Sequence, residues 1–187
     1  MLIKLPDHLS FEQGAQVPIA SSTAYSCLYQ SLSLPLPSDR NAPATSGDLL
    51  IWGGNTSVGR FAIQLAKMSG IQRIITTSSS QNFDSLRKLG ATEVFDYRDP
   101  EAGEKIHSYT AGSLRMAVDC ISEGTTPYQI STALSAAGGT IAVINPYVSR
   151  KNGVETIFTL GYTLLGDVRV RSESSTDSIS AEVLLGI

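Results

Sequence analysis

The feature that most constrains the fold is a run of four apolar residues, followed by a small-residue turn and an amphipathic segment. The run occupies residues 49–52, and the turn reads Gly-Gly-Asn-Thr-Ser at residues 53–57. Consecutive apolar residues suit a strand that is buried on both faces. In the segment that follows, apolar residues recur with the helical period: Val58, Phe61, Ala62, Leu65 and Ala66. The pattern predicts a strand, a tight turn and a helix.

This turn favours an anion. A strand that leads through small residues into a helix aims backbone N–H groups and the positive end of the helix dipole at one point. Our working hypothesis is that the turn holds the pyrophosphate of a dinucleotide. The alternative is a tight turn with a structural role only.

Strands and helices alternate through the rest of the chain. Further strands are expected at residues 71–77, 93–97, 116–121 and 140–144, with helices at 81–89, from 99 to about 112, and 127–137. Parallel strands need crossover connections, so the pattern predicts an α/β fold, a doubly wound parallel sheet of Rossmann type. Ligands of such sheets bind beyond the carboxyl ends of the strands, so we expect the residues that follow each strand to converge on one crevice.

The two ends of the chain give weaker patterns. Ser10 and Gln13 have capping-box spacing, and a helix is expected to begin near Ser22 or Thr23. Near the end, residues 154–165 predict an edge strand interrupted by a glycine. Residues 167–177 have no period and are interpreted as loop or disordered, and a last helix is expected at 181–185.

Composition excludes several classes of function. Hydrophobic residues make up 42%, charged residues 17%, and the net charge is -3, which gives no electrostatic reason to expect nucleic acid or a membrane as partner. Cys27, Cys120, His8 and His107 have no zinc-site spacing, so no metal is expected, and both cysteines are interpreted as small buried residues. Without a signal-like or long apolar stretch, a cytoplasmic protein is expected.

Two of the three glycines of a dinucleotide fingerprint are present. Gly-x-Gly-x-x-Gly falls on Gly54, Thr56 and Gly59, so the middle glycine, which lets backbone approach a pyrophosphate, is replaced. The hydroxyls of Thr56 and Ser57 could bind the phosphates instead. After the second strand, residues 77–82 contain no carboxylate that would repel a 2'-phosphate, and their hydroxyls favour NADPH over NADH. The alternative for these serines is an ordinary helix cap.

Four longer motifs carry a family resemblance. They are WGGNTSVG at residues 52–59, NFDSLRKLGA at 82–91, FDYRDP at 95–100 and AVDCI at 117–121. Together they resemble the zinc-independent medium-chain dehydrogenase/reductase superfamily, and within it the fungal trans-acting enoyl reductases of polyketide synthesis and their quinone-reductase-like relatives. The resemblance covers residues 5 to 166.

The resemblance implies NADPH as cofactor and a set of contact residues. The pyrophosphate would lie on Thr56, Ser57, Val58 and Gly59, and the 2'-phosphate on Ser79, Ser80, Gln81, Asn82 and Tyr97. The nicotinamide would lie near Ile144 and Asn145. Thr23 would border substrate and nicotinamide as the catalytic candidate; its alternative is a helix cap. Arg98 is a phosphate candidate by charge, or else a solvated loop arginine. Asp119 is expected to hydrogen bond at its strand end.

The resemblance also implies a domain plan. Residues 1–45 would be a crossing segment and helix, 46–166 the dinucleotide-binding Rossmann domain, and 167–187 a divergent, poorly ordered tail. The GroES-like catalytic domain of the family is expected to be absent from this chain.

Three functions are compatible with this plan. The first is an NADPH-dependent oxidoreductase of enoyl-reductase type in secondary metabolism, which reduces an activated C=C of a free or carrier-bound polyketide or an enoyl thioester. As an isolated chain it would be incomplete, either as a fragment of a longer product or as a chain completed by another. A polyketide synthase or a second copy in a homodimer would be its partner. The alternative is a non-redox, cyclase-like module that binds a dinucleotide or a polyketide ligand. The third is a truncated product with no function of its own.

Overall fold

The fold is described by a computed structural model that places residues 4–7, 9–39, 47–161 and 170–172. In chain order, the elements are α1 (Phe11–Tyr25), the π-helix η1 (Ser26–Ser31), β1 (Asp48–Trp52), α2 (Ser57–Met68), β2 (Arg73–Ser78), the 3-10 turn η2 (Ser80–Asn82), α3 (Phe83–Leu89), β3 (Glu93–Asp96), α4 (Ala102–Tyr109), β4 (Met116–Asp119), α5 (Thr126–Ala133), β5 (Gly139–Val143), β6 (Val154–Phe158) and β7 (Val170–Ser172).

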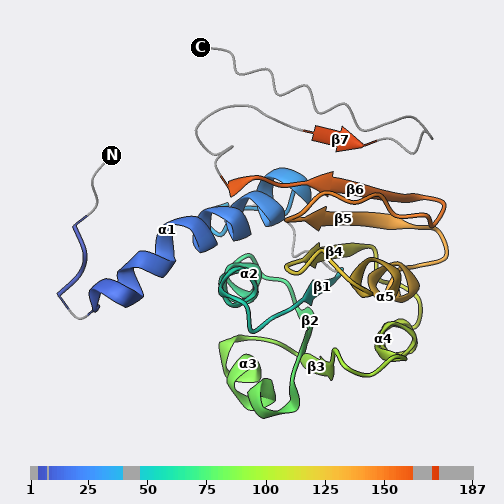
Figure 1. Ribbon diagram of the computed structural model, residues 1–187, viewed down its shortest axis with the longest axis horizontal. Helices are drawn as coiled ribbons and strands as arrows, with labels where there is room; N and C mark the ends of the chain where they lie inside the picture. Colours follow the sequence, from blue (N-terminus) through green and yellow to red (C-terminus); the bar gives the residue numbers. More distant parts are fainter. Residues whose placement is uncertain (1–3, 8, 40–46, 162–169, 173–187) are drawn as a thin grey trace.

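A sheet with the strand order β3-β2-β1-β4-β5-β6-β7 forms the centre of the molecule (Figure 1). The strands from β3 to β6 all pair in parallel, whereas β7 runs antiparallel to β6. The predicted doubly wound parallel sheet is therefore confirmed. The strand order reverses between β1 and β4, and ligands of open α/β sheets bind outside the carboxyl ends of the strands at such a point.

The side chains of β1 alternate between two cores. All five of its residues are buried, which confirms the prediction for the apolar run at residues 49–52 and adds Asp48. Leu49 and Ile51 pack in the core that includes α2, whereas Leu50 and Trp52 pack in the core that includes α4 and α5. Figure 1 shows α2 and α3 on one side of the sheet and α4 and α5 on the other. This double burial fixes the carboxyl end of β1, from which the fingerprint turn starts.

α1 is longer than the sequence predicts. The Ser10 capping box is confirmed, with the Ser10 hydroxyl accepting from the Gln13 amide at 3.3 Å. The helix then continues through Ser22 and Thr23, so the expected start at those residues is wrong. Both hydroxyls donate to the carbonyl of Ile19, at 3.0 and 2.8 Å. Such back-bonding lets hydroxyl residues lie inside a helix.

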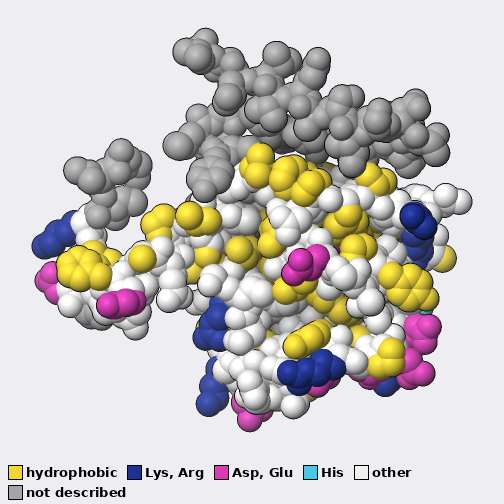
Figure 2. Space-filling model, in the orientation of Figure 1, with side chains coloured by type: hydrophobic (Ala, Val, Ile, Leu, Met, Phe, Trp, Pro, Cys, Tyr) yellow, Lys and Arg dark blue, Asp and Glu magenta, His cyan; other side chains and the backbone are white. Residues whose placement is uncertain are grey.

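The first part of α1 extends away from the sheet. Phe11 is 87% exposed and Ile19 60% exposed, and Figure 2 shows hydrophobic side chains along this extension. The buried residues of α1 all lie toward its end, at Ala20, Thr23 and Ala24. The end of α1, and not its beginning, is therefore the part that packs on the domain.

Beyond the predicted fifth strand, the fold differs in part from expectation. β6 confirms a sixth strand, but it is not the edge, because β7 pairs with it through Ile157 and Arg171. The loop interpretation is therefore wrong for Val170–Ser172. A three-residue strand has no detectable period, and its pairing is fixed by the partner backbone. The remainder of the tail, including the helix expected at 181–185, lies outside the described residues. No helix among the described residues has the length and apolar character to cross a membrane.

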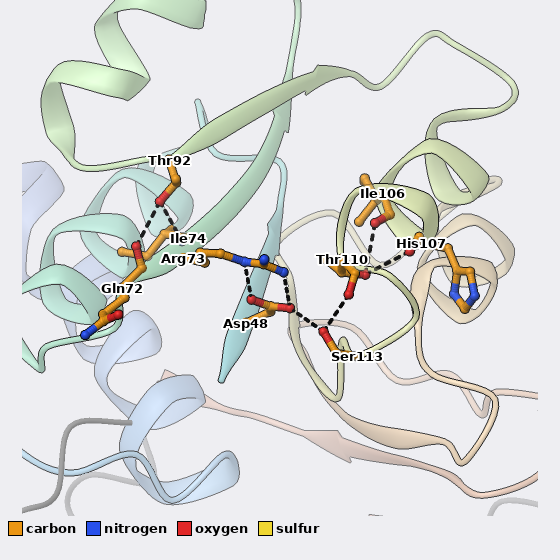
Figure 3. Close-up of polar contacts among 9 residues, drawn as sticks. All are labelled: Asp48, Gln72, Arg73, Ile74, Thr92, Ile106, His107, Thr110 and Ser113. Atoms are coloured by element: carbon orange, nitrogen blue, oxygen red, sulfur yellow. Dashed lines mark hydrogen bonds and ion pairs between the residues drawn. The ribbon is translucent and has the colours of Figure 1, made fainter. Parts of the chain in front are cut away.

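An ion pair joins β1 to β2 at the amino end of the sheet (Figure 3). The guanidinium of Arg73 contacts both carboxylate oxygens of Asp48 at 2.6 Å, and the Ser113 hydroxyl donates to the same carboxylate at 2.7 Å. These residues line a cavity of about 270 Å³ together with Gly47 and Gln72. The pair lies at the opposite end from the fingerprint turn.

Candidate functional site

The turn between β1 and α2 is anchored to the end of β2. Gly53 adopts a φ of 85°, and its amide donates to the Thr77 hydroxyl at 3.0 Å. The amide of Gly54 donates to the Thr77 carbonyl at 2.9 Å. Two neighbouring strands therefore hold the turn in place before any ligand binds.

Glycine is required by packing at two fingerprint positions. A Cβ on Gly54 would lie 2.1 Å from the Thr76 hydroxyl oxygen, and one on Gly59 would lie 2.3 Å from the Gly53 carbonyl oxygen. Gly59 thus allows the first turn of α2 to approach the strand-end backbone, which is the role of the last glycine in a dinucleotide turn.

Thr56, at the middle fingerprint position, caps α2. Its hydroxyl accepts from the Gly59 amide at 3.0 Å and donates to the Gly53 carbonyl at 2.8 Å. The hydroxyl proton is therefore used inside the turn and is not directed at a phosphate. The amides of Ser57 and Val58, which open the helix, have no acceptor within it because the first turn of a helix leaves its N–H groups unpaired. These amides supply the anion-binding character of the turn.

The hydroxyl cluster after β2 is organised by Asn82. Its side-chain amide donates to the hydroxyls of Ser78 and Ser79, at 3.2 and 2.9 Å. Ser79 makes no side-chain capping bond to η2, so the helix-cap alternative is wrong for this serine. Because both hydroxyls act as acceptors here, each keeps its proton for another acceptor. Ser80 and Gln81 lie exposed beside them.

Tyr97 and Arg98 follow the neighbouring strand β3 and extend this cluster. The Tyr97 amide donates to the Ser78 carbonyl at 3.4 Å, and the Tyr97 side chain is 49% exposed. The Arg98 guanidinium lies over the Tyr97 ring, 5.2 Å from its centroid. A positive charge is therefore held over the ring of Tyr97, the residue whose amide contacts Ser78.

Sequence reasoning missed a carboxylate at this place. Asp96 is the register partner of Ser78, and its carboxylate accepts from the Arg98 amide at 3.0 Å. The signal was present, since an aspartate ends the strand expected at residues 93–97, but only the strand pairing places it beside the end of β2.

Asp119 organises the end of β4. It is fully buried, and its carboxylate accepts from the amides of Ile121 and Ser122, at 3.0 and 2.8 Å, and from the hydroxyls of Thr126 and Tyr147, at 3.1 and 3.0 Å. Burial raises the pKa of Asp119, and the hydrogen bonds oppose that rise. The interpretation of Asp119 as a strand-end hydrogen-bonding residue is confirmed.

Ile144 and Asn145 lie beside the loop that follows β4. The Ile144 amide donates to the Ser122 hydroxyl at 3.1 Å, and the Asn145 side-chain amide is 3.5 Å from the Ile121 carbonyl. Asn145 is exposed and Ile144 half-buried. Both residues thus lie at the carboxyl ends of the strands, as the fingerprint turn does.

Thr23 reaches this edge from α1. Gly161, which follows β6, lies so close that a Cβ on it would be 2.4 Å from the Thr23 hydroxyl oxygen. The nearby Thr159 amide donates to the Val143 carbonyl at the end of β5, at 2.8 Å. Thr23 is well inside α1, so its helix-cap alternative is wrong. Its hydroxyl proton is donated to the backbone of Ile19.

The cysteines contribute no reactive thiol to this edge. Cys27 and Cys120 are both buried and unpaired, as their interpretation as small core residues predicts. Burial raises the pKa of Cys27 to about 12 and that of Cys120 well above its ordinary value. Across residues 4–7, 9–39, 47–161 and 170–172, no cluster of three or more histidine, cysteine or acidic side chains could hold a metal ion.

Comparison with known proteins identifies the relatives of the chain. Residues 57–180 match the family described as zinc-binding dehydrogenase. The chain is 42% identical over 164 residues to the trans-enoyl reductase ACTTS2 of Alternaria alternata, a match that covers 87% of this chain and 47% of that protein. It is 37% identical over 171 residues to lovC of Aspergillus terreus, the enoyl reductase component of lovastatin nonaketide synthase, covering 88% and 47%. The chain thus spans about half the length of these curated relatives.

Solved structures share the fold. The CurK enoyl reductase superposes with a TM-score of 0.65 at 21% identity, covering 82% of this chain and 46% of that one. A quinone oxidoreductase from Coxiella burnetii is 30% identical, with a TM-score of 0.55 and coverage of 79% and 41%. The family match extends over more than half of the chain. The chain therefore belongs to the zinc-binding dehydrogenase family, and the relatives that it matches include fungal trans-enoyl reductases.

Proposed function

We propose that this chain is the cofactor-binding part of an NADPH-dependent reductase of enoyl-reductase type. The observation that carries the proposal is that an amide-rich helix start and a hydroxyl cluster lie at the ends of adjacent strands β1 and β2, joined through Thr77. The relatives support the activity class, because the matched curated proteins include trans-enoyl reductases. Residues 46–166 form the binding domain and residues 1–45 lead into it.

The residues at this edge fit a dinucleotide. The pyrophosphate would lie on the first turn of α2, at Thr56, Ser57, Val58 and Gly59, where Gly59 leaves the close approach that a Cβ would fill. The 2'-phosphate would lie on Ser79, Ser80, Gln81, Asn82 and Tyr97, with Arg98 adding charge. The nicotinamide would lie near Ile144 and Asn145.

The chemistry follows from this placement. Bound NADPH supplies a hydride for the activated C=C of a polyketide or enoyl thioester. The residues of this chain orient the cofactor, and Thr23, beside Gly161, borders the substrate as the catalytic candidate. Hydride transfer needs the reacting carbons held close together with water excluded. We propose that the second wall of this enclosure comes from a further part of a longer chain, from a polyketide synthase partner or from a second copy.

Titration calorimetry with NADPH tests the cofactor. Saturable binding supports the proposal, and no heat at millimolar NADPH would overturn it.

Ser79→Asp should weaken NADPH binding by about tenfold while changing NADH binding much less, because a carboxylate repels the extra phosphate. Ser108→Asp on α4, an equal charge change near the amino end of the sheet, is the control. Equal losses for both cofactors would contradict the 2'-phosphate assignment.

One observation favours a second candidate function, a module that binds without redox turnover. The Thr23 hydroxyl donates its proton to the backbone, so it is not poised to protonate a substrate. Mixing the chain with NADPH and a crotonyl thioester separates the two. Loss of nicotinamide absorbance supports the reductase, whereas a flat trace with proven NADPH binding supports the binding module.

A further inference from the structure

Three hydrogen bonds join the loop after β4 to the loop after β5. The Tyr147 hydroxyl donates to the Asp119 carboxylate at 3.0 Å, the Ile144 amide donates to the Ser122 hydroxyl at 3.1 Å, and the Asn145 side chain approaches the Ile121 carbonyl at 3.5 Å. We call this set of contacts the Asp119 latch. It connects the two strand ends next to the switch point.

The Asp119 carboxylate at the centre of the latch is held in place by four hydrogen-bond donors. Asp119 is fully buried, and the amides of Ile121 and Ser122 fix one carboxylate oxygen while the hydroxyls of Thr126 and Tyr147 fix the other. A buried carboxylate that loses a donor leaves a costly unpaired charge, so each donor is held firmly.

Tyr147 fixes the loop of residues 144–147 by bonding to the Asp119 carboxylate. The Tyr147 ring is half-buried and packs against the apolar core that contains Trp52 and Val143. Its hydroxyl makes the polar contact, with the Asp119 carboxylate. Burial and the neighbouring carboxylate raise the pKa of Tyr147, and the phenol therefore stays protonated as a donor at neutral pH. Ser122, at a φ of 57°, holds the other end by accepting from Ile144 and donating to the Asp119 carbonyl at 3.0 Å.

We propose that Asp119 and Tyr147 are positioning residues that fix residues 144–147 where the nicotinamide half of the cofactor binds. The inference rests on the proposed function. The adenosine half is proposed to lie on β1, β2 and β3, and no hydrogen bond among the described residues joins these strands to the Tyr147 hydroxyl, so we expect removal of that hydroxyl to act on the nicotinamide half.

Tyr147→Phe tests this with a pair of ligands, NADPH and ADP-ribose 2'-phosphate, which lacks the nicotinamide. The variant keeps the ring and removes one hydroxyl. We expect its Kd for NADPH to rise about three- to tenfold, the range for the loss of one ordinary hydrogen bond, with its Kd for ADP-ribose 2'-phosphate unchanged. Tyr128→Phe is the matched control, because Tyr128 is 69% exposed on α5. Ser122→Ala breaks the latch at its other end and should give the same selective loss.

The outcomes separate this inference from the proposed function. If the unmodified chain binds neither ligand, the proposed function fails. If it binds both equally well, or if Tyr147→Phe and Ser122→Ala weaken both ligands to the same degree, the latch does not position the nicotinamide half and the inference is overturned. Circular dichroism and the thermal midpoint of each variant establish that it is folded before titration.

Discussion

At the scale of single residues, the fingerprint turn depends on what two side chains do. Gly59 has no Cβ because the Gly53 carbonyl occupies that space, and Thr56 uses its hydroxyl to close the turn on itself. A threonine at the middle fingerprint position is thus a cap, and the anion site is made of backbone amides. The side-chain phosphate contact considered for Thr56 could not be judged from sequence, because both bonds of its hydroxyl depend on the folded turn.

Gly59→Ala should destabilise the fold and the cofactor site together. A methyl group placed 2.3 Å from a backbone carbonyl forces α2 away from β1, and overpacking of this kind costs about 1–3 kcal/mol. Urea denaturation measures the free energy of unfolding, and calorimetry measures NADPH binding. Met68→Ala, a change at a 66% exposed side chain at the other end of α2, is the control. An unchanged free energy of unfolding in Gly59→Ala would show that the close approach is not rigid.

Asp119 should give the fold a distinctive pH dependence. Burial raises its folded-state pKa above the ordinary 3.8, so between 3.8 and the raised value the folded chain binds more protons than the unfolded chain. The contribution of Asp119 to the free energy of unfolding therefore falls as pH rises through this window. Asp119→Asn does not titrate, so the difference between the two proteins, measured in urea across the window, should shrink with rising pH. A difference that grew would contradict the burial effect.

At the scale of elements, the sequence predicts the strands whose side chains are buried on both faces of the sheet. It does not predict elements that form only because they pair with another strand or continue a helix. Residues 49–52 are predicted as a strand because their side chains pack alternately into the two cores. β2 is buried in the same way, whereas only Val94 of β3 is fully buried. Two hydroxyl residues in α1 suggested a helix start, but their bonds to Ile19 keep them inside the helix. β7 has only three residues and is a strand because it pairs with β6. No local sequence pattern predicts this pairing.

The side-chain amide of Gln129 adds hydrogen bonds to the apolar packing of α4 on α5. Gln129 accepts from the Gly103 amide at 2.8 Å and donates to the Pro100 carbonyl at 2.6 Å, and it is 7% exposed. Gln129→Met fills about the same volume but leaves the buried Gly103 amide and the Pro100 carbonyl without their Gln129 partner, so the free energy of unfolding should fall by about 1–3 kcal/mol. Tyr128→Phe on the same helix should leave it unchanged. Urea denaturation of both variants is the measurement, and equal stability of the two would refute the role of Gln129.

At the scale of the whole molecule, the candidate site is assembled from segments far apart in the sequence. The sequence placed residues 56–59, 79–82 and 144–145 at strand ends, and the strand order brings these ends to one edge. It could not show Asp96 beside Ser78, because register decides which residues of neighbouring strands meet. Nor could it show Thr23 against Gly161, since that contact joins α1 to the residues after β6.

The ion pair of Asp48 and Arg73 lies at the amino end of the sheet, opposite the candidate site. The two ends of the sheet therefore differ in how freely their residues can be substituted. At the amino end, charge and hydroxyl contacts tie β1 to β2 and to Ser113, and none of them touches the candidate site. Loops at the carboxyl end can therefore exchange residues without loosening the strands that carry them. A chain built in this way can acquire a new substrate by altering one rim while its opposite rim preserves the fold.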